Sequence, residues 1–152
     1  MDRLKILEQS EICKGLTSEE VGLIGELCED KVYREGEVIF AEGSRGRELY
    51  VLKQGKVRID FLVKGRDDTA TVHRMTPGQV FGEVALVDRG RRSATAVCEC
   101  DTQVMVVDCD RLYELLDSNH HIGYVLMRNF ATVLAGRLRK AGLQLVASIL
   151  WE

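Results

Sequence analysis

The spacing of apolar and polar positions divides the chain into three blocks, and the first of them, residues 1 to about 30, predicts helix. Thr17 followed by Glu20 has the form of a capping box, in which Thr17 is the N-cap residue and the Glu20 side chain reaches back to it. Apolar residues then recur at helical spacing, at Val21, Leu23, Ile24, Leu27 and Cys28. We therefore expect the chain to begin with a helical lead that carries an apolar stripe.

The second block, residues 31 to about 108, alternates short β-rich runs with glycine turns. The clearest runs are Val38–Phe40, Leu49–Leu52 and Val57–Phe61, and Thr102–Val107 supplies a closing strand. The segment KQGK at 53–56, between two of these runs, predicts a hairpin turn. Regularly spaced short strands with glycine turns favour a sandwich or a barrel over a parallel sheet.

The third block, residues 109 to about 150, is helical again. Asp110 is placed to cap a short helix that ends near Leu116, and a longer helix follows from about His120 to near Leu150. Apolar residues of the longer helix recur mainly at spacings of three and four, at Ile122, Leu126, Phe130, Val133, Leu134, Leu138, Leu145 and Ile149. This spacing predicts an amphipathic helix.

Composition narrows the class of protein. The 152 residues, of which 45% are hydrophobic and 30% charged, are ordinary for one soluble globular domain. With 21 basic and 24 acidic residues the net charge is −3, which argues against the broad positive surface of a direct nucleic-acid binder. Since no apolar run reaches the ~18–20 residues that cross a bilayer, and the N-terminus lacks the apolar core of a signal peptide, we expect a cytoplasmic protein that makes no membrane contact.

The five cysteines, an odd number at irregular spacing, do not predict a disulfide framework. Cys98 and Cys100 fall in a predicted strand, where they would point to the same face. A metal site needs more ligands at a suitable spacing, and neither this cysteine pair nor His120 with His121 has them. We therefore expect reduced thiols and no bound metal.

One segment interrupts the strand pattern, the sequence FGEVALVDRGRRSATA from Phe81 to Ala96. Its first six residues are enough for one helical turn. Gly82 and Ala85 are small, so a ligand could approach the backbone closely. A helical turn followed by a loop could also bring Glu83 and Arg92 together, either at a ligand or as a purely structural ion pair.

These residue types supply what a cyclic nucleotide needs from a protein. Its cyclic phosphate carries one negative charge, with which a fixed guanidinium such as that of Arg92 can pair in fork geometry. Backbone N–H groups at the start of a short helix also favour an anion, and Ser93 adds a hydroxyl. The ribose hydroxyl needs an acceptor, which Glu83 provides, and the base needs an apolar lid.

At these residues the sequence resembles the phosphate-binding cassette of the cyclic-nucleotide-binding domain family, which includes protein kinase A regulatory subunits, bacterial catabolite activator proteins and cyclic-nucleotide-gated channels. YREGEVIFAEGSRGRELYVLKQGKVRI resembles the family's first strands, GLTSEEV resembles its entering helix, and DRGRRSATA is closest to the gated-channel branch. The resemblance covers nearly the whole chain. It implies a single domain of the α+β class, an antiparallel β-roll of the double-stranded β-helix or jelly-roll type at 31–108, flanked by the helical lead 1–30 and by C-terminal helices at 109–150.

The resemblance also implies which residues hold the phosphate and the ribose. Glu83 would accept a hydrogen bond from the ribose 2′-hydroxyl, and Arg92 would pair with the phosphate. Ser93 would assist, and the remaining phosphate contacts would come from the backbone amides of Gly82, Val84 and Ala85.

For the base, the resemblance places Val72, on the strand before the cassette, on one side and the final helix on the other. A hydroxyl at Ser93 is associated in the family with acceptance of cyclic GMP, so the implied ligand is cAMP or cGMP, with the preference open. Arg91 is the weaker arginine candidate. The basic residues of the final helix, Arg128, Arg137, Arg139 and Lys140, are expected mainly on a solvated face, although one of them could reach the ligand.

Three functions remain in competition. The first is a regulatory module that shifts its final helices when a cyclic nucleotide binds. The second is a roll that binds no ligand and serves protein interaction or dimerisation through the final helix. The third is an enzyme with a cupin-like roll, which is disfavoured because His73 is the roll's one histidine and no HxH pattern is present. We therefore expect a binding protein without cofactor or enzymatic activity, whose partners are the nucleotide, a second copy or an effector protein.

Overall fold

The computed structural model describes residues 3–63, 69–88 and 90–150, with only the backbone described for Val84, Ala85 and Asp88. Helices α1 (Arg3–Gln9) and α2 (Ser18–Gly25) come first. Six strands follow, β1 (Cys28–Tyr33), β2 (Val38–Phe40), β3 (Glu48–Gln54), β4 (Val57–Leu62), β5 (Thr69–Met75) and β6 (Val80–Phe81). The chain continues with α3 (Glu83–Asp88), β7 (Thr95–Cys98), β8 (Thr102–Asp108), α4 (Cys109–Ser118) and α5 (His120–Leu150).

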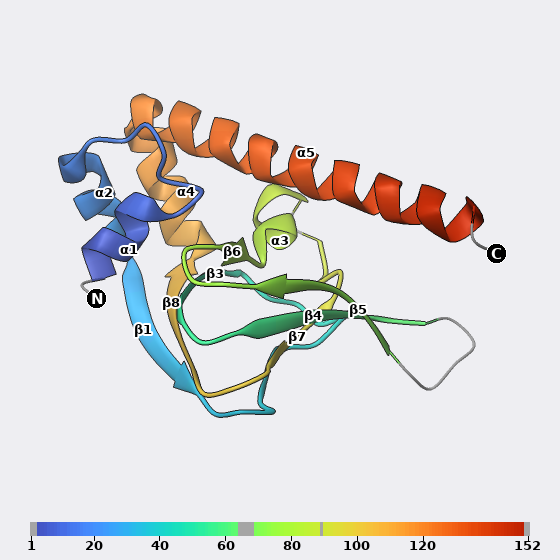
Figure 1. Cartoon of the computed structure of the whole chain (residues 1–152). Coiled ribbons are helices and arrows are strands. Elements are labelled where there is room, and N and C mark those ends of the chain that lie inside the picture. Colours follow the sequence, from blue (N-terminus) through green and yellow to red (C-terminus); the bar gives the residue numbers. More distant parts are fainter. Residues whose placement is uncertain (1–2, 64–68, 89, 151–152) are drawn as a thin grey trace.

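The strands form two antiparallel four-stranded sheets, in the orders β1-β8-β3-β6 and β2-β7-β4-β5. Side chains from both sheets pack into one apolar cluster, which includes Leu52, Val57, Phe81 and Val104. A second cluster joins the first sheet to the helices through residues such as Leu49, Met105 and Leu126. Helices lie at one end and along one side of the sheets (Figure 1). The predicted fold, an α+β antiparallel roll flanked by N-terminal and C-terminal helices, is confirmed.

The turn at 53–56 differs from its prediction. The chain bends there, and Gly55 adopts a positive φ of 107°. However, β3 pairs with β6 and β8, whereas β4 pairs with β5 and β7. The turn therefore carries the chain from one sheet to the other and is not a hairpin, a distinction that local turn chemistry does not encode.

Local sequence placed one helix start correctly and another wrongly. The capping box of α2 is confirmed, since the Thr17 Oγ1 accepts from the Glu20 N–H and the Thr17 N–H donates to the Glu20 carboxylate. For α4, the N-cap residue is Asp108, not Asp110, and its side chain accepts from the backbone N–H of Arg111 at 3.2 Å.

Two cysteine predictions were also wrong. Cys28 does not continue the first helical stripe but begins β1, where it pairs with Val107 of β8. Cys100 does not share a strand face with Cys98, because β7 ends at Cys98. Cys98 is buried and Cys100 is exposed.

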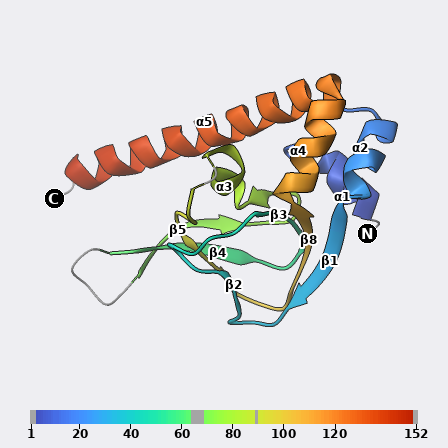
Figure 2. The same ribbon diagram turned by 180° about the vertical axis from the view of Figure 1, so that it is seen from behind.

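Helix α5 has 31 residues and the predicted bounds. Its first half is anchored in the core, where Ile122, Leu126 and Phe130 are buried. The Asn129 side-chain amide donates to the carbonyl of Ile12 at 2.7 Å, which ties α5 to the segment between α1 and α2. Its second half continues over α3, beyond the N-terminal helices (Figure 2). Within the described ranges, none of the helices is long and apolar enough to cross a membrane.

Candidate functional site

The cassette segment begins where β6 ends. Phe81 pairs with Tyr50 of β3 and is 1% exposed, so the strand that leads into α3 is fixed in the core. The backbone of Gly82 then adopts a φ of +83°, a conformation that is rare for residues with a Cβ. At its other end α3 is held by the Tyr113 hydroxyl of α4, which donates to the carbonyl of Leu86. Glu83 is therefore presented from a short helix with two fixed ends.

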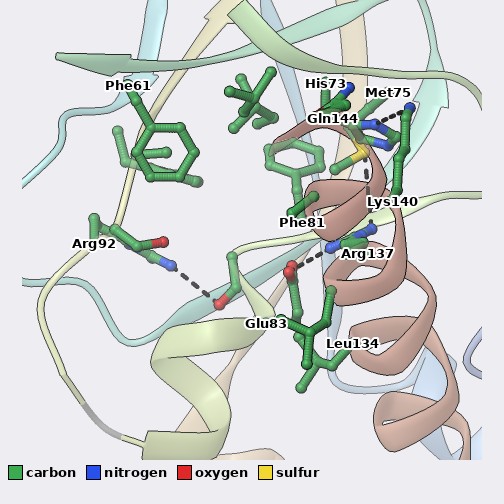
Figure 3. Close-up of a pocket in the computed structure, with 18 residues that line it drawn as sticks. Phe61, His73, Met75, Phe81, Glu83, Arg92, Leu134, Arg137, Lys140 and Gln144 are labelled. Atoms are coloured by element: carbon green, nitrogen blue, oxygen red, sulfur yellow. Dashed lines mark hydrogen bonds and ion pairs between the residues drawn. The ribbon is translucent and has the colours of Figure 1, made fainter. Parts of the chain in front are cut away.

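A cavity of about 390 Å³ lies between α3, the second sheet and the second half of α5. This volume is within the range of small-molecule sites. Much of its wall is apolar and includes Phe40, Ile59, Phe61, Val72, Leu134 and Leu138. Polar side chains project from several elements, namely His73, Glu83, Arg92, Arg137, Lys140 and Gln144 (Figure 3).

Arg92 is the most deeply placed cation of the cavity, with 2% of its side chain exposed. Its guanidinium donates to the Glu48 carbonyl at 2.9 Å and to the Gly82 carbonyl at 3.3 Å. It lies 4.3 Å from the centre of the Phe40 ring, a cation–π distance. These contacts fix the guanidinium before any ligand contributes.

Two glycines make room for this guanidinium. A Cβ on Gly46 would lie 2.4 Å from an Arg92 terminal nitrogen, and a Cβ on Gly82 would lie 2.8 Å from the other. Both distances are too short for a non-bonded contact, so the observed position of the Arg92 guanidinium requires glycine at both sites.

The positive charge of Arg92 is only partly compensated within the described residues. The nearest carboxylate oxygen, from Glu48, lies at 3.4 Å on a side chain that is 45% exposed. The buried Arg92 Nε has no hydrogen-bond partner in the described part of the chain. A buried cation with an unused donor is unfavourable unless a counter-charge completes it.

Glu83 is buried, with 6% of the residue exposed, and its partner is not Arg92. Instead the Glu83 carboxylate pairs with the guanidinium of Arg137 on α5. The same guanidinium donates to the Val80 carbonyl at 2.6 Å and to the Glu11 carboxylate at 3.2 Å. The prediction of a solvated Arg137 is therefore wrong, and this residue links α5 to the cassette (Figure 3).

The structure gathers most of the predicted binding residues around one cavity. Val72, Gly82, Glu83, Arg92 and Ser93 line it. Val84 and Ala85 follow Glu83 on α3, and their side chains lie outside the described residues. Arg91, the weaker candidate, is exposed and donates to the carbonyl of Gly43 at 2.9 Å.

Sequence reasoning missed the roles of Gly46 and His73 and misjudged Arg137, whereas Lys140 is exposed as expected and also lines the cavity. His73 and Lys140 meet at the cavity, with Lys140 Nζ 3.3 Å from His73 Nδ1. A usable signal was present on α5, since Arg137 lies one turn after Leu134 and therefore beside the apolar stripe.

The cyclic nucleotide-binding domain family matches residues 30–119. The chain belongs to this family. The match includes the whole cassette segment, and the resemblance found in the sequence is thereby confirmed.

Two relatives of the cyclic nucleotide-binding domain and one solved structure show how wide this similarity is. The cyclic AMP receptor protein of Thermus thermophilus is 34% identical over 91% of this chain and 62% of its own length. A mouse hyperpolarization-activated cyclic nucleotide-gated channel 3 is 32% identical over 74% of this chain and 13% of its own. The crystal structure of a Thermus thermophilus catabolite activator protein has a TM-score of 0.80, at 34% identity, over 91% of this chain and 62% of that one.

These proteins are a receptor, a channel and an activator, and none is named as an enzyme. This chain spans about three fifths of the first relative and a small part of the channel. The comparisons therefore support a cyclic nucleotide-binding domain. The activities of the longer relatives are properties of those whole proteins.

Proposed function

We propose that this domain binds a cyclic nucleotide, cAMP or cGMP, as a non-enzymatic regulatory module that needs no cofactor. The observation that carries the proposal is Arg92, a buried guanidinium at the cavity wall whose Nε–H has no partner among the described residues. The cyclic phosphate of the ligand would supply the missing negative charge. The name of the Thermus relative, a cyclic AMP receptor protein, supports the same ligand class.

The other contacts of the ligand follow from the same placement. With its phosphate at Arg92, its ribose hydroxyl would reach Glu83, the buried carboxylate of the cavity. Ser93 and the backbone amides of Gly82, Val84 and Ala85 would complete the phosphate contacts. Val72 would pack on one face of the base.

Helix α5 would carry the signal. Leu134 and Leu138 line the cavity from α5, so a bound base would contact this helix directly. A ligand shifts an equilibrium only by its difference in affinity for the two arrangements. Contacts to α5 provide such a difference, because they exist only when the helix packs over the cavity.

A second candidate function is a dimerisation or protein-interaction module, and the end of α5 favours it. Large apolar residues there are 53–75% exposed, namely Leu138, Leu143, Leu145, Val146, Ile149 and Leu150. Exposed apolar surface of this kind marks interaction sites. We propose that a second copy or an effector protein packs there, without direct nucleic-acid contact, and sedimentation with and without cAMP separates ligand-linked from constitutive dimers.

The experiment that tests nucleotide binding is calorimetric titration of the full chain with cAMP and cGMP. Arg92→Met removes the buried cation, and Arg91→Met is the matched control because its side chain is exposed. Losing the charge-assisted contacts should cost ~1.5–3 kcal/mol, a loss of affinity of about tenfold to more than a hundredfold. The proposal fails if the wild type binds neither nucleotide at micromolar concentration, and the phosphate assignment fails if Arg92→Met binds like Arg91→Met.

A further inference from the structure

Polar side chains gather at the end of the cavity away from Arg92. His73 comes from β5, while Lys140 and Gln144 come from successive turns of α5, and all three line the cavity. Lys140 Nζ lies 3.3 Å from His73 Nδ1, so the two elements meet there. Figure 3 shows this pair and Arg92 on opposite sides of the pocket.

The hydrogen-bonding character of this end follows from the Lys140–His73 contact. A lysine ammonium can only donate, so Nδ1 of His73 is the acceptor and the neutral ring carries its proton on Nε2. Burial lowers the pKa of His73, and the nearby charges of Lys140 and Arg137 lower it further, against a weaker opposite effect of Glu83. The ring is therefore neutral at neutral pH and offers a donor.

Donors thus exceed acceptors at this end. Lys140 keeps N–H groups beyond the one that His73 uses, and His73 adds its Nε2–H. The Gln144 amide contributes one group of each kind. The apolar walls beside them cannot distinguish two purines of nearly equal size and shape.

Adenine and guanine differ in what they would present to these donors. Guanine carries two neighbouring acceptors, O6 and N7, and Lys is one of the side chains that read this pair in nucleic acids. Adenine has an amino group at the same position, so it offers N7 alone and sets a donor against a donor.

We propose that Lys140 is a specificity-determining residue, which favours a guanine over an adenine base by donating to O6 and N7. The inference rests on the proposed function, since it requires the phosphate at Arg92 and the ribose at Glu83, which directs the base toward Lys140. It predicts that the domain accepts cGMP and that this acceptance depends on Lys140.

The test compares the affinities of the full chain for cAMP and cGMP in three proteins. Lys140→Met keeps the length of the side chain and removes its charge. Arg139→Met is the matched control, because Arg139 is exposed on the same helix. In Lys140→Met the affinity for cGMP relative to cAMP should fall about tenfold, with the affinity for cAMP changed by less than about threefold. Arg139→Met should leave the ratio unchanged.

Cyclic inosine monophosphate identifies the atoms that are read. It keeps O6 and N7 of guanine and lacks the 2-amino group, so Lys140→Met should weaken its binding as much as that of cGMP. An unchanged ratio in Lys140→Met, with both nucleotides still bound, overturns this inference and leaves the proposed function intact. Failure of the wild type to bind any cyclic nucleotide overturns both.

Discussion

Replacing Arg137 with methionine tests whether helix α5 holds Glu83 in position for a ribose. The wild-type guanidinium pairs with the Glu83 carboxylate and donates to the Val80 carbonyl. Methionine fills much of the same space, so the change removes the charge and the hydrogen bonds more than the packing. Glu83 would then be a buried carboxylate without its cation.

The magnitude follows from the burial of the two partners. Removing one member of a fully buried ion pair costs ~3–5 kcal/mol, because the other charge is left uncompensated. Glu83 is nearly buried, with 8% of its side chain exposed, but Arg137 is 23% exposed, so water can replace part of the interaction. We expect the free energy of unfolding to fall by about 2–3 kcal/mol.

Two measurements check this prediction. Urea unfolding gives the stability of Arg137→Met, with Arg139→Met as the control. Calorimetry with cAMP and 2′-deoxy-cAMP gives the contribution of the ribose 2′-hydroxyl as the difference between the two binding free energies. For the wild type we expect a difference of ~1.5–3 kcal/mol, the usual value for a hydrogen bond to a charged group.

In Arg137→Met that difference should shrink to under about 1 kcal/mol, because a carboxylate released from its partner no longer points at the hydroxyl. A purely structural role would weaken both ligands by the same factor. Equal losses for cAMP and 2′-deoxy-cAMP would therefore refute the reasoning, even if the stability falls as expected.

Two further predictions concern the position of Arg92 and the start of α2. Gly46→Ala should lower cyclic-nucleotide affinity at least about tenfold with the circular dichroism spectrum unchanged, because its Cβ would lie 2.4 Å from the Arg92 guanidinium; wild-type affinity would contradict this. The pKa of Glu20 is lowered, mainly by the backbone N–H of Thr17 and secondly by the His121 side chain. The ionised Glu20 carboxylate therefore stabilises the folded state, and this stabilisation should be lost as pH falls below ~4. Urea midpoints should therefore separate wild type from Glu20→Gln as pH rises from ~3 to ~5, and parallel curves would contradict it.

The features that the sequence predicted correctly are mostly local. The capping box joins Thr17 to Glu20 within one turn, and the strands around Val38–Phe40 and Thr102–Val107 reflect short β-rich runs between turns. Neighbouring residues decide such patterns, so the folded chain keeps them. The cassette could be predicted from the sequence for a related reason, because Glu83 and Arg92 lie in one short segment.

Three predictions failed because contacts with residues distant in the sequence decided the outcome. Arg137 looks like an ordinary helix-surface cation until folding places it beside Glu83 and Val80. Cys28 fits a helical stripe, but pairing with β8 decides its conformation. Leu138, assigned to an apolar stripe, lines the cavity and yet is 75% exposed.

The energetics of α5 limit what a ligand can do to it. Arg137 binds Glu83, Val80 and Glu11 through protein groups alone, so these contacts favour the packed helix at any ligand concentration. A nucleotide adds only its own contacts with α5, and the shift that it causes cannot exceed their free energy. Strong contacts of Arg137 therefore keep α5 packed in most molecules without ligand, so that ligand binding can shift only a small unpacked fraction to the packed state. It follows that weakening these contacts, as Arg137→Met does, should lower affinity while enlarging the response of α5 to ligand. Affinity and response are thus set in opposite directions by one side chain.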